Sequence, residues 1–387
     1  MTIFDKLDST IPIDETERAV LESVREAARE ITERAAEYDK TSTFPWKNVE
    51  LINTLGLNTM FIPEEFGGMP LSYNCYLACV REISMACAST GIIWATNFHA
   101  IKPLVDFGTA EQKARFLPVM AEGGLASLAI TEPGAGSDAT GMTTRFREDG
   151  DEIVINGGKV FITSGDVADL YLLFGKWEGI DDPKRAISTL ILQKGTPGLN
   201  ILGKEEKLGM RASSTAAIGF EDCRVPRANL IGKPGDGLKI LFASLNKSRP
   251  SIAAHALGIA RAAFDDAVAY INERRQSGRR IIEFQGIQFM LADLAAELAL
   301  CESWLWTVGA RIGAGEQDIG IEASILKMRA SDLAMKMTTD AVQMFGGYGY
   351  CAGPRVERLM RDAKITQIWE GTNQVHRQLI GRSFLTK

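Results

Sequence analysis

The stretch Leu125–Ser137, LASLAITEPGAGS, decides the fold, because the spacing of apolar residues changes across it. Before this stretch, apolar residues recur every three or four positions, which is typical of amphipathic helices. After it, the pattern predicts short strands separated by turns, with candidates at 169–176, 186–193 and 215–220. We therefore expect a helical segment to be followed by a β-rich one.

Within the β-rich segment, residues 152–163 carry a turn signal. Glu152–Asn156 is a strand-like run, Gly157 and Gly158 follow it, and Lys159–Thr163 is again strand-like. Adjacent glycines between two such runs favour the tight turn of a β-hairpin, because glycine accepts positive φ angles. We therefore predict a hairpin over 152–163.

Helical patterns flank the β-rich segment on both sides. The expected helices cover 15–38, 71–88 and 110–120 before it, and 237–275, 284–312, 322–345 and 356–365 after it. The long C-terminal helices carry full apolar stripes, which need partner helices within the chain and across subunits. The predicted fold class is α+β and multidomain, with a helical domain over 1–125, a β domain over 126–235 and a helical bundle over 236–387.

The composition excludes several classes of function. The 387 residues carry a net charge of −6, which gives no electrostatic reason to bind nucleic acid or an anionic membrane. Residues 1–10 show no basic region followed by an apolar run, and no stretch reaches about 18 uninterrupted apolar residues. We therefore expect no signal peptide, no membrane span and a reducing, cytoplasmic location.

Residues that commonly bind metals are sparse or unsuitably spaced. None of the six cysteines forms a Cys-x-x-Cys pair, which argues against zinc and thioredoxin-like sites. The three histidines, His99, His255 and His376, lie far apart in the sequence. We expect no metal site, and we assign acid–base chemistry to a carboxylate.

Two glycine-rich stretches are candidate binding loops. The glycine spacing in 134–141 does not match G-x-G-x-x-G, and a strand rather than a helix follows, which excludes a dinucleotide-binding fingerprint. A tight surface loop is the alternative interpretation there. The second stretch, Phe345–Tyr350, closes a long helix with more glycines than a C-cap needs, which indicates close approach of a ligand to the backbone.

Glu370 is the candidate general base. It lies on a predicted connection between helices, flanked by the bulky Ile368 and Trp369, and Thr372 is placed to cap the next helix. Loss of hydration beside a tryptophan would favour its use as a base. The alternative is an ordinary exposed loop glutamate.

Arginines provide two further candidates. Residues 273–280 hold four arginines near a helix end, which suit either a solvated helix terminus or a clamp for a diphosphate. Arg249 precedes Pro250, which is expected to kink a helix. This arginine is either functional or a cap for the carbonyls that the proline frees.

Several motifs together make the sequence resemble the acyl-CoA dehydrogenase family over essentially its whole length. These motifs occur in the same order, and at nearly the same spacings, as in that family. They are ITEPGAGSD at 130–138, KVFIT at 159–163, KLGMRASST at 207–215, FEDCRVP at 220–226, QMFGGYG at 343–349, and RDAKI at 361–365 running into WEGTNQ at 369–374.

This resemblance implies an N-terminal helical domain, a middle β-barrel-like domain and a C-terminal four-helix bundle, assembled as a homotetramer. It also implies non-covalent FAD and α,β-dehydrogenation of an acyl-CoA thioester to the 2-enoyl-CoA, with electrons passed to an electron-transferring flavoprotein. By position, Glu370 matches the base that removes the α-proton while the β-hydrogen leaves as hydride to flavin N5. Arg249 matches an arginine below this carboxylate.

The resemblance also assigns binding residues. The flavin ring is expected against Leu128, Ile130, Thr131, Gly136, Ser137, Phe161, Ile162 and Thr163. The rest of FAD is expected against Arg274, Gln276, Gln343, Gly346 and Gly347 across a subunit interface, with Thr372 and Gln374 completing the set. The substrate is expected against Trp94, Ser137, Asn246, Arg249, Trp369, Glu370 and Gly371.

Three departures from the family pattern leave alternatives open. Phe161 stands where a tryptophan commonly packs on the flavin, Ser277 where phenylalanine is usual, and Trp369 where tyrosine is common. The alternatives are an acyl-CoA oxidase, a desulfinase, an enoyl-CoA reductase and a non-catalytic flavin-binding relative. If Trp94 points inward, it shortens the acyl cavity and favours short, branched or cyclic groups; the alternative is an ordinary core tryptophan.

Overall fold

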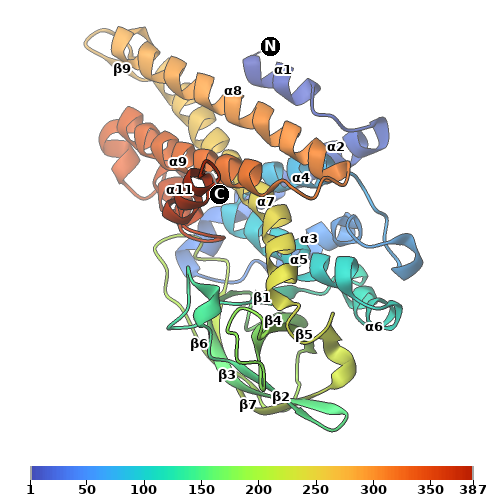
Figure 1. Cartoon of the computed structure of the whole chain (residues 1–387). Coiled ribbons are helices and arrows are strands. Elements are labelled where there is room, and N and C mark those ends of the chain that lie inside the picture. Colours follow the sequence, from blue (N-terminus) through green and yellow to red (C-terminus); the bar gives the residue numbers. More distant parts are fainter. Residues whose placement is uncertain (1, 386–387) are drawn as a thin grey trace.

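The computed structural model describes residues 2–385 and consists of a helical body with a β-sheet at one end (Figure 1). The N-terminal helices are α1 (Ile3–Ser9), α2 (Glu15–Thr41), α3 (Trp46–Thr54), α4 (Tyr73–Ala86), α5 (Ala88–Phe107) and α6 (Ala110–Ala121). They confirm the helical expectation for the first third of the chain. No helix in the described residues combines the length and apolarity that a bilayer crossing requires.

Local sequence explains where these helices begin. Asp14 accepts a hydrogen bond from the Glu17 backbone at 2.8 Å, while the Glu17 side chain accepts one from the Asp14 backbone. This capping box satisfies two backbone donors that the first turn of α2 would otherwise leave free. Thr109 and Gln112 start α6 in the same way. Most of α5 lies deep in the body, so polar side chains such as Thr96, Asn97 and His99 are buried.

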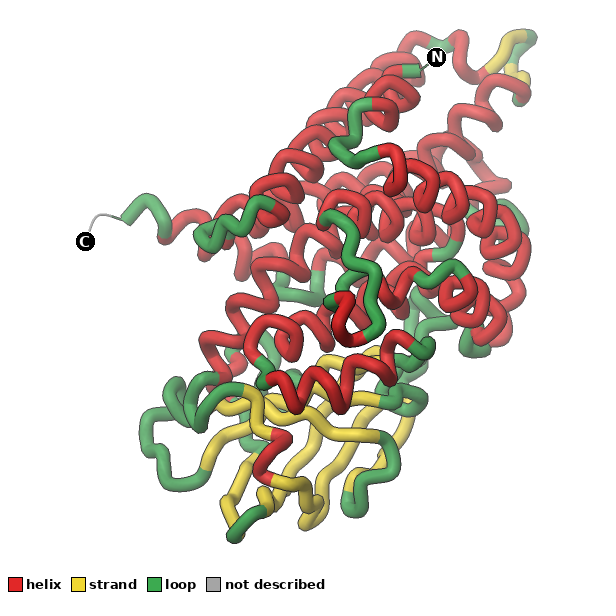
Figure 2. The backbone as a smooth tube through the Cα atoms, turned by 90° about the vertical axis from the view of Figure 1, so that its right-hand side faces the viewer, coloured by secondary structure: helices red, strands yellow, loops and turns green. Residues whose placement is uncertain are grey.

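Strands β1 to β8 form one sheet at the lower end of the molecule (Figure 2). They are β1 (Ala126–Ala129), β2 (Arg145–Asp149), β3 (Glu152–Thr163), β4 (Leu170–Trp177), β5 (Ile187–Gln193), β6 (Leu199–Lys204), β7 (Thr215–Pro226) and β8 (Leu230–Ile231). Their order is β6-β7-β3-β2-β4-β5-β8, with β1 parallel to β4. This arrangement places the ends of β1 and β3 beside the helical body.

The predicted hairpin over 152–163 is wrong, because these residues form the single strand β3. Both halves of β3 pair with β7, and the register shifts between Ile155 and Gly157. Gly157 has φ +141°, and a Cβ there would lie 2.7 Å from the Thr144 Cα. The glycine thus permits an irregularity and close packing in a continuous strand, a use of strand glycine as common as a turn.

Three long helices build the C-terminal part of the body. They are α7 (Gly237–Glu273), α8 (Gln285–Gly313) and α9 (Gly320–Phe345), followed by the shorter α10 (Val356–Lys364) and α11 (Asn373–Arg382). α7 packs against α4, α5, α8, α9 and α10, which makes it the central helix. The helices predicted for this part of the chain agree closely with the observed ones. α7 continues as one helix through Pro250.

Candidate active site

Glu370 lies on the connection between α10 and α11, as predicted, and its carboxylate turns into the body. The side chain is only 14% exposed. The Ser248 hydroxyl on α7 donates a hydrogen bond of 2.6 Å to Glu370 Oε2. The other oxygen, Oε1, lies 4.0 Å from Nδ1 of His99 on α5. These contacts exclude the alternative of an ordinary exposed loop glutamate.

The backbone at Glu370 is strained. Glu370 has φ +54° and Gly371 has φ +93°. A non-glycine residue in such a conformation costs about 1–3 kcal/mol and persists where its surroundings enforce it. One enforcing contact comes from Lys327 on α9, whose buried ammonium donates to the Gly371 carbonyl at 2.7 Å and to Asn373 Oδ1 at 3.1 Å. Burial lowers the pKa of Lys327 to about 7.

Residue Thr372 caps α11, which places a helix N-terminus beside the strained pair. Its hydroxyl accepts from the Val375 backbone at 3.2 Å, which confirms the predicted cap. Gln374 lies on the exposed surface of the first turn. The positive end of the helix dipole therefore lies next to Glu370 and favours negative charge there.

All three histidines converge on the segment Trp369–Gly371, although their sequence spacing gave no sign of this. His99 approaches Glu370, and the rings of His255 and Trp369 meet edge to face with centroids 5.6 Å apart. A Cβ built on Gly371 would lie 3.2 Å from His376 Nε2. Burial lowers the pKa of His255 to about 4 and, with the nearby Lys327 and Arg249 charges, that of His376 to about 3. Both rings are therefore neutral near pH 7.

Arg249 is buried beside the Glu370 carboxylate. It is 6% exposed, and its guanidinium donates a long hydrogen bond of 3.4 Å to Ser324 on α9. Burial lowers the pKa of Arg249, and the charge of Glu370 opposes this shift. In the described part of the chain, Arg249 bonds Ser324 and no carbonyl freed by Pro250, so the capping alternative fails. Asn246, one turn earlier on α7, contacts the start of α9 at Gly320.

The two predicted tryptophans occupy different settings. Trp369 is half-buried and packs on His255 against the core, whereas its neighbour Ile368 is 48% exposed, so only one of the two flanking side chains shields the loop. Trp94 is 1% exposed and packs on Tyr76 with ring centroids 5.4 Å apart. Burial raises the pKa of Tyr76, and the charge of Glu370 adds to the shift. Trp94 thus contacts an aromatic ring that senses the charge of Glu370.

The segments assigned to the flavin ring come together at the ends of β1 and β3. The Val160 backbone donates to the Thr131 carbonyl at 2.9 Å, and the Ser127 hydroxyl donates to the Thr163 carbonyl at 2.7 Å. Phe161 is 63% exposed and has φ +60°, so a strained backbone presents its ring outward. The structure groups the predicted Leu128, Ile130, Thr131, Phe161, Ile162 and Thr163 here, with Gly136 and Ser137 on the exposed loop that follows β1.

A buried ion pair holds this junction and was not predicted. Lys159 donates to Glu132 Oε1 at 2.7 Å and to the Ile130 carbonyl at 2.9 Å. Burial lowers the pKa of Lys159 to about 8. Burial alone would raise the pKa of Glu132, but hydrogen bonds from Lys159, Thr144 and Thr143 lower it to about 2. Both residues occur within the quoted motifs, but the sequence does not show that they pair.

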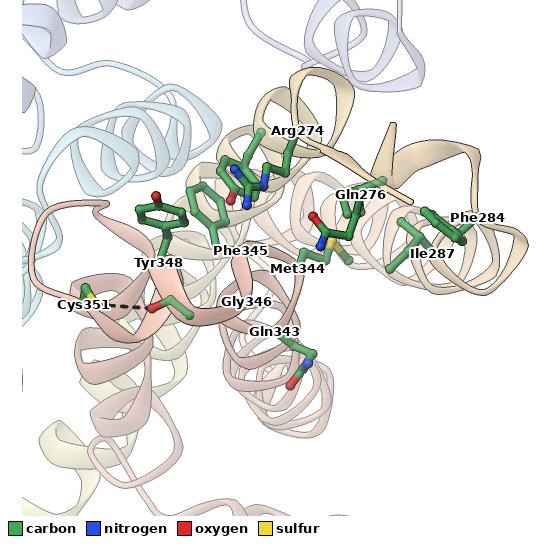
Figure 3. A pocket seen from close by; sticks show the side chains of 13 residues that line it. Arg274, Gln276, Phe284, Ile287, Gln343, Met344, Phe345, Gly346, Tyr348 and Cys351 are labelled. Carbon is green, nitrogen blue, oxygen red and sulfur yellow. Dashed lines mark hydrogen bonds between the residues drawn. The ribbon is translucent and has the colours of Figure 1, made fainter. Parts of the chain in front are cut away.

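The remaining predicted flavin residues line a separate cleft of about 840 Å³ between the end of α7, the start of α8 and the end of α9 (Figure 3). These residues are Arg274, Gln276, Gln343, Gly346 and Gly347. Aromatic rings add to the wall, since Tyr270 and Phe345 stack with centroids 4.1 Å apart. A Cβ on Gly346 or Gly347 would meet nothing within 4 Å, so the backbone there is open to a ligand.

The chemistry of this cleft fits the adenosine diphosphate part of FAD. A guanidinium suits phosphate oxygens, amide side chains suit the hydrogen-bonding edge of a base, and aromatic rings suit its face. Ser277, the residue that departs from the family pattern, does not line the cleft. It has φ +52° in the turn between β9 (Arg275–Gln276) and β10 (Arg279–Arg280).

Comparison with known proteins agrees with this geometry. The chain matches three domain families: acyl-CoA dehydrogenase N-terminal domain over 14–124, middle domain over 127–223, and C-terminal domain over 235–385. A probable acyl-CoA dehydrogenase of Mycobacterium tuberculosis is 42% identical, over 93% of this chain and 92% of that protein.

Two solved structures have nearly the same fold. Butyryl-CoA dehydrogenase from Megasphaera elsdenii is 35% identical, with a TM-score of 0.93 over 97% of this chain and 99% of that one. A chain solved in a study of the electron transferring flavoprotein of Acidaminococcus fermentans and flavin-based electron bifurcation is 39% identical, with a TM-score of 0.94 and the same coverage. The protein is therefore an enzyme that belongs to the acyl-CoA dehydrogenase family.

Proposed function

We propose that this enzyme oxidises an acyl-CoA thioester to the 2-enoyl-CoA, with Glu370 as the base that removes the α-proton. The observation that carries this proposal is the Glu370 carboxylate, which is turned into the body and held by the Ser248 hydroxyl at 2.6 Å. A carboxylate fixed in this way keeps one oxygen, Oε1, available for a proton. Arg249 supplies a buried positive charge near it.

FAD is the cofactor of the proposed reaction, and when bound it accepts the β-hydrogen as hydride. The junction of β1 and β3 would hold its ring, with the exposed Phe161 against one face. The cleft lined by Arg274 and Gln276 would hold its diphosphate. The protein's own task is to orient the thioester and exclude water.

The helix N-terminus beside Glu370 supports activation of the thioester. Removing the α-proton places negative charge on the thioester oxygen, which needs hydrogen-bond donors and positive potential. We propose that the Glu370 backbone N–H donates to this oxygen, with the dipole of α11 adding to the potential. The strained conformation at Glu370, φ +54°, would aim this donor.

A homotetramer would complete the flavin site. The cleft at Arg274 and Gln343 lies at the ends of long helices, away from the β1–β3 junction, so one FAD would contact two subunits. Exposed apolar side chains on α8, Phe289 at 61% and Leu300 at 72%, offer a surface for such packing. Light scattering of the FAD-loaded enzyme would measure its oligomeric state, and a tetramer is the expected result.

We propose a short acyl chain as substrate and an electron-transferring flavoprotein as acceptor. The bulk of Trp94 beside Tyr76 supports a short cavity, and the butyryl-CoA dehydrogenase relative supports the same substrate class. The deciding experiment supplies butanoyl-CoA and longer acyl-CoAs to the FAD-loaded enzyme under anaerobic conditions. Flavin bleaching with formation of the 2-enoyl-CoA supports the proposal, and no bleaching with any acyl-CoA contradicts it. Rapid peroxide formation in air would instead indicate an oxidase.

A further inference from the structure

Three buried polar side chains form a chain of contacts behind the Glu370 carboxylate. They are Ser248, Ser251 and His99, and each is at most 3% exposed. The Ser251 hydroxyl donates to the Ser248 carbonyl at 2.7 Å, and His99 Nε2 lies 2.5 Å from the same Ser251 oxygen. On its other side, the His99 ring turns Nδ1 toward Glu370 Oε1 at 4.0 Å.

These contacts favour one tautomer of the neutral His99 ring. The Ser251 hydroxyl has one hydrogen, and the Ser248 carbonyl accepts it. With its hydrogen engaged in this way, the Ser251 oxygen acts as the acceptor toward His99, which assigns the hydrogen of the neutral ring to Nε2. In the neutral ring, Nδ1 then has a free lone pair, and that lone pair faces Glu370.

We propose that His99 is a positioning residue that takes the α-proton over from Glu370 through Nδ1. This role rests on the proposed dehydrogenation. First, the α C–H bond breaks and an O–H bond forms at Glu370 Oε1; the electron pair of that bond becomes the new C=C bond, and the β-hydrogen would leave as hydride to the FAD that the proposed function requires. The O–H bond then breaks as an N–H bond forms at His99 Nδ1. The result is an imidazolium beside an ionised carboxylate, with no change in the number of protons.

The surroundings of His99 keep the ring neutral before the transfer. Burial lowers the pKa of His99, so the ring is neutral before the transfer. The negative charge of Glu370 opposes this shift and is the neighbouring charge that favours the imidazolium. The other titratable groups that face this region are Tyr76 on α4 and Arg249 and His255 on α7, with Lys327 on α9 beyond Glu370. Arg249 opposes a second positive charge, so the imidazolium is short-lived and can return its proton to Glu370.

The transfer can be measured as exchange of substrate hydrogen with solvent. The probe is 3,3-dimethylbutanoyl-CoA in D₂O, which has α-hydrogens but no β-hydrogen, so the FAD-loaded enzyme can exchange it without oxidising it. In His99→Gln, the amide nitrogen still donates to Ser251 but accepts no proton. Without the acceptor, Glu370 returns its proton to the substrate, and exchange should fall about tenfold or more, at the low end of proton-transfer effects. His255→Gln controls for the loss of a buried imidazole, because its Nε2 bonds the Ala88 carbonyl instead.

The outcomes separate this inference from the proposed function. If His99→Gln exchanges within about twofold of wild type while Glu370→Gln abolishes exchange, His99 has no such role and the base assignment stands. If the wild type shows neither exchange nor flavin reduction, both fail. The tautomer of His99 can also be measured directly, without any active variant. Because the chain has only 3 histidines, NMR of the ¹⁵N-labelled imidazoles can resolve each ring. A hydrogen on Nε2 and none on Nδ1 supports the inference, and a hydrogen on Nδ1 at neutral pH overturns it.

Discussion

The Ser248 hydroxyl on α7 and the Glu370 carboxylate on the loop before α11 are joined by a hydrogen bond of 2.6 Å. This bond ties the base to the central helix of the body, although 122 positions separate the two residues. It fixes one carboxylate oxygen and leaves the other for proton transfer. A hydrogen bond to a charged group contributes about 1.5–3 kcal/mol.

Ser248→Ala should therefore slow substrate reduction of the flavin by roughly tenfold to a hundredfold. The carboxylate would lose its anchor and sample orientations unsuited to the α-carbon. Stopped-flow reduction with saturating acyl-CoA measures the effect. Ser248→Thr keeps the hydroxyl and should retain most of the rate; equal rates for the alanine and threonine variants would show that the bond is unimportant.

Arg274→Ala should weaken FAD binding by about tenfold, because the cleft would lose its guanidinium for the diphosphate. The adjacent Arg275 is a matched control, since it carries the same charge but does not line the cleft. Equilibrium dialysis of FAD against both variants measures the difference. Equal losses of affinity would point to general electrostatic attraction rather than a specific contact.

Trp94→Ala should shift the preferred acyl chain toward longer substrates, because a large side chain beside Tyr76 would be removed. Deleting a buried tryptophan costs about 3–5 kcal/mol of stability, so Trp94→Phe is the milder companion variant. The measurement is kcat/KM over a series of acyl-CoA lengths. An unchanged optimum in a folded variant would show that Trp94 is core structure only.

Lys327→Met should flatten the rise of stability with pH. Burial lowers the pKa of Lys327 from 10.5 to about 7 in the folded protein. Between these values the unfolded chain binds the proton and the folded protein does not, so the free energy of unfolding rises with pH, by at most about 1.4 kcal/mol per unit. Unfolding of both proteins at several pH values in this window measures the contrast, and parallel curves would contradict it.

Much of the fold and site could be predicted because the signals are local. Apolar spacing predicted the long helices, and the family resemblance assigned Arg274, Gln343 and Gly346 to FAD; the structure places all three on one cleft. Gly157 led to the wrong prediction of a hairpin over 152–163, because a glycine suits a turn and a strand irregularity equally. The contacts of Ser248, Lys327 and His99 with the loop at Glu370 depend on how distant helices pack, which no local pattern encodes.

Glu370→Gln removes the proposed base and leaves the rest of the site in place. The amide keeps the size and one oxygen of the carboxylate but cannot accept the α-proton at neutral pH. Anaerobic mixing of the FAD-loaded variant with butanoyl-CoA should leave the flavin absorbance unbleached, with rates at least about a hundredfold below wild type, while FAD remains bound. Bleaching at the wild-type rate would contradict the account, because Glu370 could not then be the base.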